Sequence, residues 1–308
     1  MWAKVLFGLA VAYVVAAGAW VIFAGVVREG ERVELLNVAC DPTRELWRDV
    51  NAAFVRDYQE KHGVTLSIRQ SHGGSGSQAR SVIDGLQADV VTLALWTDTD
   101  AVRKAGLMDR GWENKLPNRS LPYVSTIVFV VRKGNPRGIH DWGDLPNAEV
   151  ITPNPKTSGN GKWSFLALWG SQVWRGKSQD EAREYLTRVF RRVPVLDAAA
   201  RGATMTFAQK QIGDVHLTWE NEAHLEVQES GGALEIVYPS VSVLAEPHVA
   251  VVDRNVDRKG TRAAAEAYLQ FLYTEPAQEL IAKHYHRPTN RAVFERHKGT
   301  FPQLDLRR

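Results

Sequence analysis

Strand-like and helix-like runs alternate along nearly the whole chain, and this alternation limits the possible fold more than any other feature. Nine short apolar runs read as strands: Val33–Ala39, Val64–Ile68, Asp89–Leu95, Thr126–Arg132, Glu149–Thr152, Val193–Leu196, Val215–Trp219, Leu234–Tyr238 and His248–Val252. Helical patterns lie between them, the first running from Pro42 to about His62. Such alternation is typical of an α/β fold with mainly parallel sheets.

The length and the connections predict two lobes. A chain of 308 residues suggests two domains on a prior of roughly 150 residues each, and no long Pro- or Gly-rich linker separates them. Two extended segments, Tyr123–Arg132 and Val243–Val252, are candidates for crossings between lobes, which makes the first lobe discontinuous. Asp41 is expected to cap the first helix, with Pro42 at the favoured first position.

Two glycine- and serine-rich segments, Gln70–Gln78 and Asn154–Trp163, each follow a strand-like run and open a helix-like run. In open α/β sheets ligands bind at the carboxyl ends of strands, and the start of a helix presents N–H groups to an anion. The first segment adds the hydroxyl of Ser75, and Ser158–Asn160 offer three successive N–H groups in the second. Helix capping explains each segment equally well when it is taken alone, so both interpretations stay open at this point.

No catalytic or metal-binding motif accompanies these segments. Gly159–Lys162 lacks the spacing and the hydroxyl residue of a Walker loop, and Ser77 interrupts the Gly-x-Ser-x-Gly pattern of a hydrolase nucleophile. His284 and His286 form one His-x-His pair, which is more often a surface pair than a metal site. We therefore expect no enzyme, no metal and no cofactor.

The charge and the single cysteine narrow the function further. A net charge of +3 without a dense basic run argues against a nucleic-acid partner, so an anion has to be held by local groups. Cys40 excludes an internal disulfide. Its expected role is that of a small buried core residue, with a redox or thiosulfate-related role as the lesser alternative.

The N-terminal segment Val5–Val27 contains 23 residues and no charge. As a helix it would reach ~35 Å, enough to span a bilayer. Cleavage after Ala17–Ala19 makes it a signal peptide, whereas the exposed apolar end that cleavage leaves at Trp20 favours an uncleaved anchor. Either interpretation places the body of the protein outside the cytoplasm.

Several motifs in order resemble the bacterial sulfate/thiosulfate-binding proteins, the extracytoplasmic receptors of ABC importers. The matching segments are Asp41–Glu45, Gln70–Gly76, Ala88–Ala94, Val131–Pro136, Ile151–Lys156, Ala200–Gly202, Gly213–Val215, Trp219–Glu222 and Leu244–Pro247. The resemblance covers roughly Leu35 to Leu306. Many separate matches in order are far more specific than either Gly/Ser segment alone.

The resemblance implies a two-lobed periplasmic-binding-protein fold of the second structural type. Each lobe is then a mixed, mainly parallel sheet flanked by helices, preceded by the N-terminal apolar helix. Residues 1–30 are assigned to the signal peptide or anchor, 31–123 and 250–308 to the first lobe, and 124–249 to the second. The hinge crossings are expected near 123–132 and 243–252.

The resemblance also implies a dehydrated sulfate held by uncharged donors. Carried onto the matching positions, these are the backbone N–H of Asp41, the hydroxyls of Ser75 and Ser158, the N–H groups of Gly159, Asn160 and Ala200, and the indole N–H of Trp219. Asp41 and Ser75 come from the first lobe and the others from the second. The carboxylate of Asp41 is expected to turn away from the anion and cap its helix.

Three departures from the family pattern stand out. Asn160 replaces a usual glycine, so its side chain is expected to narrow or reshape the pocket. Cys40 stands where an aromatic residue is usual. The chain stops at Arg308 without the C-terminal extension common in the family, which affects one packing element and not the site.

These features together predict an extracytoplasmic sulfate or thiosulfate receptor, a monomer in the periplasm or anchored to the inner membrane, that delivers its anion to the permease subunits of an ABC importer. The alternative is a membrane-tethered oxyanion sensor or scaffold with the same fold that does not feed transport. An esterase that uses Ser75 is the least favoured reading, because no base or metal cluster accompanies the serine.

Overall fold

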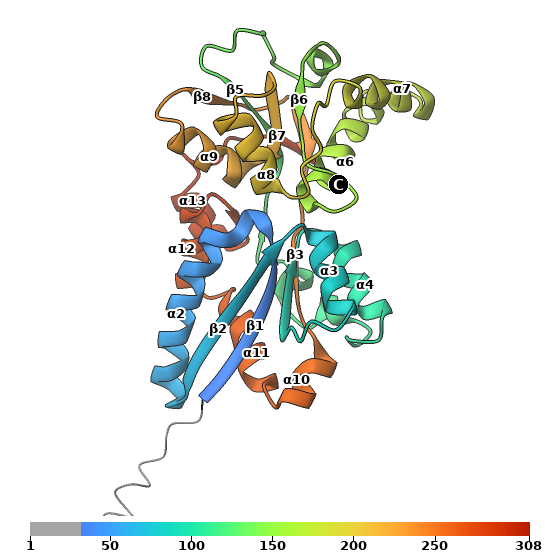
Figure 1. The fold of residues 1–308 in the computed structure, drawn as a ribbon. Coiled ribbons are helices and arrows are strands. Elements are labelled where there is room, and N and C mark those ends of the chain that lie inside the picture. Colours follow the sequence, from blue (N-terminus) through green and yellow to red (C-terminus); the bar gives the residue numbers. More distant parts are fainter. Residues whose placement is uncertain (1–31) are drawn as a thin grey trace, which may run out of the picture.

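The computed structural model describes residues 32–308, which form two lobes stacked one above the other (Figure 1). Residues 1–30 and the predicted N-terminal apolar helix lie outside the described residues. Among residues 32–308, no helix combines the length and the apolar character that a membrane span needs.

The first lobe is built on a four-stranded sheet in the order β10-β3-β1-β2. Its strands are β1 (Arg32–Cys40), β2 (Thr65–Gly73), β3 (Val90–Leu93) and β10 (His248–Val251). Its helices include α2 (Arg44–His62), α3 (Ser75–Ile83), α4 (Trp96–Lys104), α10 (Asp253–Lys259), α11 (Arg262–Phe271) and α12 (Glu275–Lys283). β1 pairs in parallel with β2 and β3, and only β10 is antiparallel.

Local sequence explains the longest of these helices. Trp47, Val50, Phe54 and Tyr58 are buried along one face of α2, at the spacing of a helix that packs on a sheet. The helix ends at Gly63, which adopts a left-handed φ of 67° and donates its N–H to the carbonyl of Gln59. Glycine tolerates this conformation without the steric cost that a Cβ brings.

The second lobe is built on a sheet in the order β6-β7-β5-β8. Its strands are β5 (Ile127–Arg132), β6 (Val150–Ile151), β7 (Val215–Trp219) and β8 (Leu234–Val237), and its helices include α6 (Gly159–Val173), α7 (Gln179–Phe190), α8 (Ala200–Thr204) and α9 (Glu220–Glu229). β5 pairs antiparallel with both β7 and β8, and only β6 and β7 are parallel. The expected mainly parallel sheet therefore holds for the first lobe but not for the second.

One predicted strand is missing. Val193–Leu196 forms no strand and pairs with no strand of the described chain, and Val195 and Leu196 are exposed. The carbonyl of Arg192, just before this segment, accepts from the N–H of Val150 in strand β6. Pro194 has no N–H to donate, which interrupts a ladder.

Two small sheets lie beside the Ser125–Ala245 bridge, where the chain crosses between the lobes. β4 (Tyr123–Val124) pairs with β11 (Arg287–Pro288), and β9 (Val241–Val243) pairs in parallel with β12 (Asp305–Arg307). Val241 and Val243 pack in the apolar cluster of the second lobe, so β12 lies with that lobe. This departs from the expectation that residues 250–308 belong wholly to the first lobe; the other lobe boundaries stay a prediction.

The register of the first sheet brings the ends of three strands together. Cys40 pairs with Gly73, and Ala39 pairs with Thr92. The carboxyl ends of β1, β2 and β3 therefore reach the same edge of the sheet, facing the second lobe (Figure 1).

Candidate functional site

The two Gly/Ser segments face each other across the cleft between the lobes. A Cβ added to Gly159 would overlap the Cβ of Ala94 and lie 2.9 Å from the Cβ of Ser75. A Cβ added to Gly74 would overlap the carbonyl oxygen of Thr157. Only glycine allows the two segments to approach this closely.

Hydrogen bonds join the lobes at the same place. The N–H of Gly76 donates to the carbonyl of Thr157 at 3.1 Å, and the indole N–H of Trp163 donates to the carbonyl of Ala94 at 2.8 Å. The side-chain amide of Asn221 donates to the carbonyl of Pro42 at 2.8 Å. The structure is therefore that of closed lobes.

The predicted ligand residues share one structural position, the start of a helix. Ser75, Gly159 and Ala200 are the first residues of α3, α6 and α8, and Asp41 opens the short 3₁₀ helix η1 (Asp41–Thr43). Asn160 is the second residue of α6, and Trp219 is the N-cap of α9. The first N–H groups of a helix have no acceptor within it, and they lie at its positive end.

The structure brings most of these residues to one region. Ser75 lies against Gly159, and Gly74 lies against the carbonyl of Ala198, two residues before Ala200. The carboxylate of Asp41 accepts a hydrogen bond from the N–H of Arg201, the residue after Ala200. Trp219 belongs to the same buried cluster as Cys40 and Ala94.

The hydroxyl of Ser75 is used inside the protein. It donates to Oδ2 of Asp98 at 2.7 Å and accepts from the N–H of Ala94 at 3.0 Å. A hydroxyl has one proton, so in this arrangement it does not donate to an anion, although the sequence predicts that it does. The group that Ser75 still offers is its backbone N–H, at the start of α3.

Ser158 is arranged differently. It caps α6, its hydroxyl oxygen accepting from the N–H of Gly161 at 3.3 Å. Among residues 32–308 this hydroxyl has no acceptor for its own proton. Ser158 can therefore cap its helix and donate to a ligand at once.

Trp219 carries a buried donor without an acceptor. Its side chain is 0% exposed, and no acceptor for its Nε1 is found in the described part of the chain. Indole is a donor only, and leaving such a group unpaired in the interior costs roughly 1–3 kcal/mol. An acceptor that binds in the cleft would remove this cost.

The side chain of Asn160 turns toward the second sheet. Its Nδ2 donates to the carbonyl of Leu217 in β7 at 3.3 Å, whereas its buried Oδ1 has no partner among the described residues. Because Leu217 contributes an acceptor, the amide nitrogen has to face it. The backbone N–H of Asn160 stays at the start of α6, as expected.

Asp41 does not cap the first helix. The N-cap of η1 is Cys40, and no side chain provides a capping hydrogen bond there. The carboxylate of Asp41 instead accepts from the guanidinium of Arg44 at 2.6 and 2.8 Å and from the N–H of Arg201 at 2.9 Å. The carboxylate is therefore occupied by a guanidinium and an amide partner.

Ion pairs across the cleft were not predicted from the sequence. Lys162 of α6 pairs with Asp98 of α4. Arg201 of α8 pairs with Glu45 of α2 at 3.1 Å and, within its own lobe, with Glu222 at 3.4 Å. Each partner lies far from the other in sequence, so no local pattern signals the pairing.

Burial shifts the pKa of two groups near the site toward their neutral forms. Burial raises the pKa of Glu222 to about 8, even though the charge of Arg201 acts to lower it. Burial lowers the pKa of His286 to about 3; its ring packs on Tyr123 and edge-on to Trp219 at a centroid distance of 6.5 Å. His286 is thus a core residue, although its His-x-His pattern is typical of the surface.

Cys40 is buried behind Asp41. Burial raises the pKa of its thiol to about 12. A thiol that stays protonated at neutral pH is a poor nucleophile and a poor metal ligand. Its environment therefore matches the expected core role.

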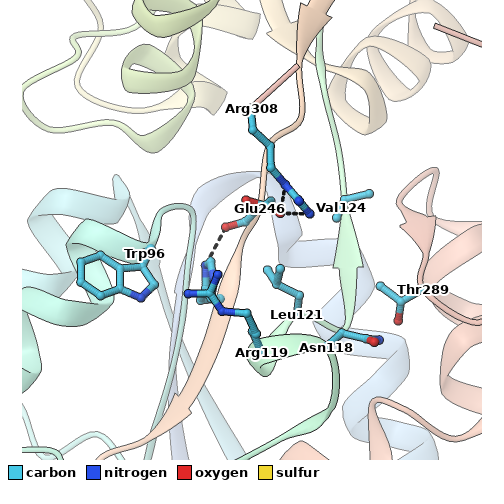
Figure 2. Close-up of a pocket in the computed structure, with 9 residues that line it drawn as sticks. Trp96, Asn118, Arg119, Leu121, Val124, Glu246, Thr289 and Arg308 are labelled. Carbon is cyan, nitrogen blue, oxygen red and sulfur yellow. Dashed lines mark hydrogen bonds and ion pairs between the residues drawn. The ribbon is translucent and has the colours of Figure 1, made fainter. Parts of the chain in front are cut away.

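A separate cavity of about 560 Å³ lies at the hinge (Figure 2). Arg308 and Arg119 approach it from opposite sides, and Glu246 accepts from Arg308 at 3.0 Å. None of the predicted ligand residues lines this cavity. The candidate anion site is therefore distinct from it.

Comparison with known proteins places this geometry in a family. Residues 36–287 match the family described as bacterial extracellular solute-binding protein. The chain is 51% identical over 278 residues to a sulfate-binding protein of Escherichia coli, a match covering 89% of this chain and 84% of the relative. It is 47% identical over 276 residues to a thiosulfate-binding protein of Pseudomonas aeruginosa, covering 88% and 83% of the two chains.

A solved structure agrees with these sequences. The sulfate-binding protein SubI of Mycobacterium tuberculosis superposes with a TM-score of 0.80 at 32% identity, covering 88% of this chain and 92% of the other. The fold, the closed cleft and the family match lead to one conclusion: this chain belongs to the bacterial extracellular solute-binding proteins.

Proposed function

We propose that the protein is an extracytoplasmic receptor that closes around sulfate or thiosulfate and delivers the anion to an ABC importer. Relatives at 51% and 47% identity are named for those two anions, which supports the ligand class. The mechanism is binding and hinge closure without covalent chemistry.

The observation that carries the proposal is the unpaired indole N–H of Trp219. It is fully buried in the closed structure and needs an acceptor, which no residue of the described chain supplies. Sulfate supplies oxygen acceptors and has no proton at neutral pH. The anion and the indole therefore satisfy one another.

The proposed site holds the charge with dipoles. Its donors are the N–H groups of Asp41, Ser75, Gly159, Asn160 and Ala200, the hydroxyl of Ser158 and the indole of Trp219. The helix starts that carry these groups are well suited to a buried anion. A protonated phosphate has to donate a hydrogen bond, and a site without an acceptor for it leaves that donor unpaired.

Calorimetric titration of the full-length chain with sulfate, thiosulfate, molybdate and phosphate tests the proposal. We expect sulfate and thiosulfate to bind and hydrogen phosphate to bind far more weakly. Failure to bind any tetrahedral oxyanion would reject the receptor function.

The proposal extends to location and partners. The receptor acts as a monomer in the periplasm or, if the N-terminal segment is not cleaved, anchored to the inner membrane, and it contacts permease subunits. N-terminal sequencing of the mature protein separates these forms, because a start near Trp20 or later removes the anchor. Loss of sulfate uptake on gene deletion distinguishes transport from the alternative role as a tethered sensor.

A further inference from the structure

A groove of about 350 Å³ lies along the edge of the cleft, beside the proposed anion site. Its walls come from α3 and α4 of the first lobe and from Lys156 and Lys162 of the second lobe. Gly76, next to Ser75, lines one end. The groove therefore forms where the lobes meet, immediately outside the site.

The groove is lined by more cations than anions. Its cationic lining residues are Arg80, Lys156 and Lys162, and its anionic ones are Asp84 and Asp98. Lys162 is already paired with Asp98. Arg80 and Lys156 are exposed, and neither forms an ion pair with any residue from 32 to 308, so their charge acts on whatever enters the groove.

A single carboxylate separates the groove from the site. Asp98 binds Lys162 through Oδ1 and the Ser75 hydroxyl through Oδ2. An anion in the groove is thus one side chain away from the start of α3. The proposed site itself uses uncharged donors, so attraction over a distance has to come from residues outside it.

We infer that Arg80 on the first lobe and Lys156 on the second, which meet at this groove when the lobes close, attract the dianion to the open cleft before closure. The inference rests on the proposed function and adds two residues to it. Charges at the mouth of a cleft raise association rates, and this effect falls as salt screens them. They change the rate of arrival more than the stability of the closed complex.

The test is stopped-flow tryptophan fluorescence of the full-length chain with sulfate, comparing wild type with the double variant Arg80→Gln, Lys156→Gln. Removing two charges near a dianion should lower the association rate constant about fivefold at ~10 mM ionic strength and about twofold or less at ~150 mM. The dissociation rate constant should stay within about twofold of wild type.

The matched control is the double variant Arg56→Gln, Lys283→Gln. These residues are exposed on α2 and α12, on the flank away from α3 (Figure 1), and neither forms an ion pair within the described chain. The control changes net charge equally and should leave the association rate within about 1.5-fold of wild type, because distant charges are screened.

Two results overturn the inference while the proposed function stands. One is an unchanged association rate and salt dependence in Arg80→Gln, Lys156→Gln. The other is an equal loss in the control, which makes the effect one of net charge. If wild type gives no sulfate signal and calorimetry finds no binding, the proposed function itself fails.

Discussion

Ser75 and Ser158 both stand beside glycine at the start of a helix, yet their hydroxyls do different work. Ser75 binds Asp98 and the N–H of Ala94, both in its own lobe. Ser158 accepts from Gly161 in its own helix, and no residue from 32 to 308 takes its proton, which leaves that proton for a ligand. The first segment is thus held in place by its lobe, whereas the second keeps a hydroxyl proton available for the proposed anion.

The comparison shows that one sequence pattern can serve two purposes. In the first lobe, Asp98 binds the serine and also binds Lys162 across the cleft. In the second lobe, no carboxylate of the described chain binds the serine. The difference predicts that a change at Ser75 affects mainly the stability of the closed structure, whereas a change at Ser158 affects mainly ligand binding.

The largest expected effect comes from filling the contact between the segments. Gly159→Ala places a Cβ into Ala94 and near Ser75, so the lobes cannot close fully. Sulfate affinity should fall about 100-fold, or roughly 3 kcal/mol, the upper range for overpacking. Calorimetric titration measures this loss of affinity. Gly143→Ala is the control, because a Cβ at that position meets no other atom within 4 Å. Affinity within about threefold of wild type would mean that the segments do not meet in the bound state.

Trp219→Phe measures how much the indole N–H, a donor outside both Gly/Ser segments, contributes to sulfate affinity. The ring stays apolar, but the ligand loses one buried hydrogen bond. Sulfate binding should weaken by ~1–3 kcal/mol. Trp142→Phe is the matched control, because its indole is also buried but donates to the carbonyl of Val241; it should lower stability and leave affinity unchanged. Equal affinities for wild type and Trp219→Phe reject the assigned donor.

The two serines provide the direct contrast. Ser158→Ala removes a ligand donor and a helix cap, so sulfate affinity should fall by about 1 kcal/mol. Ser75→Ala removes two internal hydrogen bonds, so it should lower the free energy of unfolding by about 1–3 kcal/mol while affinity changes less than about threefold. Urea unfolding and calorimetry on both variants separate the outcomes. A reversed pattern would contradict the different roles given to the hydroxyls.

A pH dependence of the free energy of unfolding, separate from these effects on affinity, is expected from the second lobe. The pKa of Glu222 is raised to about 8 in the folded state, against 4.5 for the unperturbed group. The folded protein therefore keeps a proton that the unfolded chain releases, so this contribution is complete below pH 4.5 and is lost as pH rises toward 8. The free energy of unfolding should fall by about 1 kcal/mol per pH unit in that window.

Glu222→Gln keeps the shape and removes the titration. Urea unfolding between about pH 5.5 and about pH 8.5 should therefore show a flatter profile for this variant than for wild type. Glu235→Gln, on the partly exposed strand β8, is the control and should follow wild type. Parallel profiles for wild type and Glu222→Gln would show that Glu222 is already charged.

Periodicity and motif order predicted the two-lobed α/β fold and the meeting of the two Gly/Ser segments. The strands that precede the Gly/Ser segments were found from short apolar patterns: Leu66 and Ile68 alternate with polar residues in β2, and Val150 and Ile151 are buried side by side in β6. The direction of the strands in the second sheet was not predicted correctly, because an apolar run looks the same in parallel and in antiparallel pairing. The prediction of a strand at Val193–Leu196 was wrong. Its apolar residues fit a strand, but Pro194 has no N–H to donate and prevents the pairing.

The hydrogen-bond partners of the candidate site residues were harder to predict than the elements that carry these residues. From the sequence, the hydroxyl of Ser75 was expected to donate to the anion. The sequence could not show that Asp98, 23 positions away, accepts this proton instead. It likewise expected Asp41 to cap a helix, because Asp before Pro usually does. The competing partner, the N–H of Arg201, comes from 160 positions away and the other lobe.

The pairing of β12 with β9 has a mechanical consequence. The chain passes between the lobes near Val124, again near Glu246, and a third time before Asp305, where it joins the second lobe. Two strands running side by side resist bending poorly and twisting only moderately. The third attachment lies directly beside the second crossing, where the N–H of Leu244 donates to the carbonyl of Arg307 at 2.7 Å, so it stiffens the hinge on that side against twisting. When the lobes open and close again, the two Gly/Ser segments then follow the same path and come back to the same contacts.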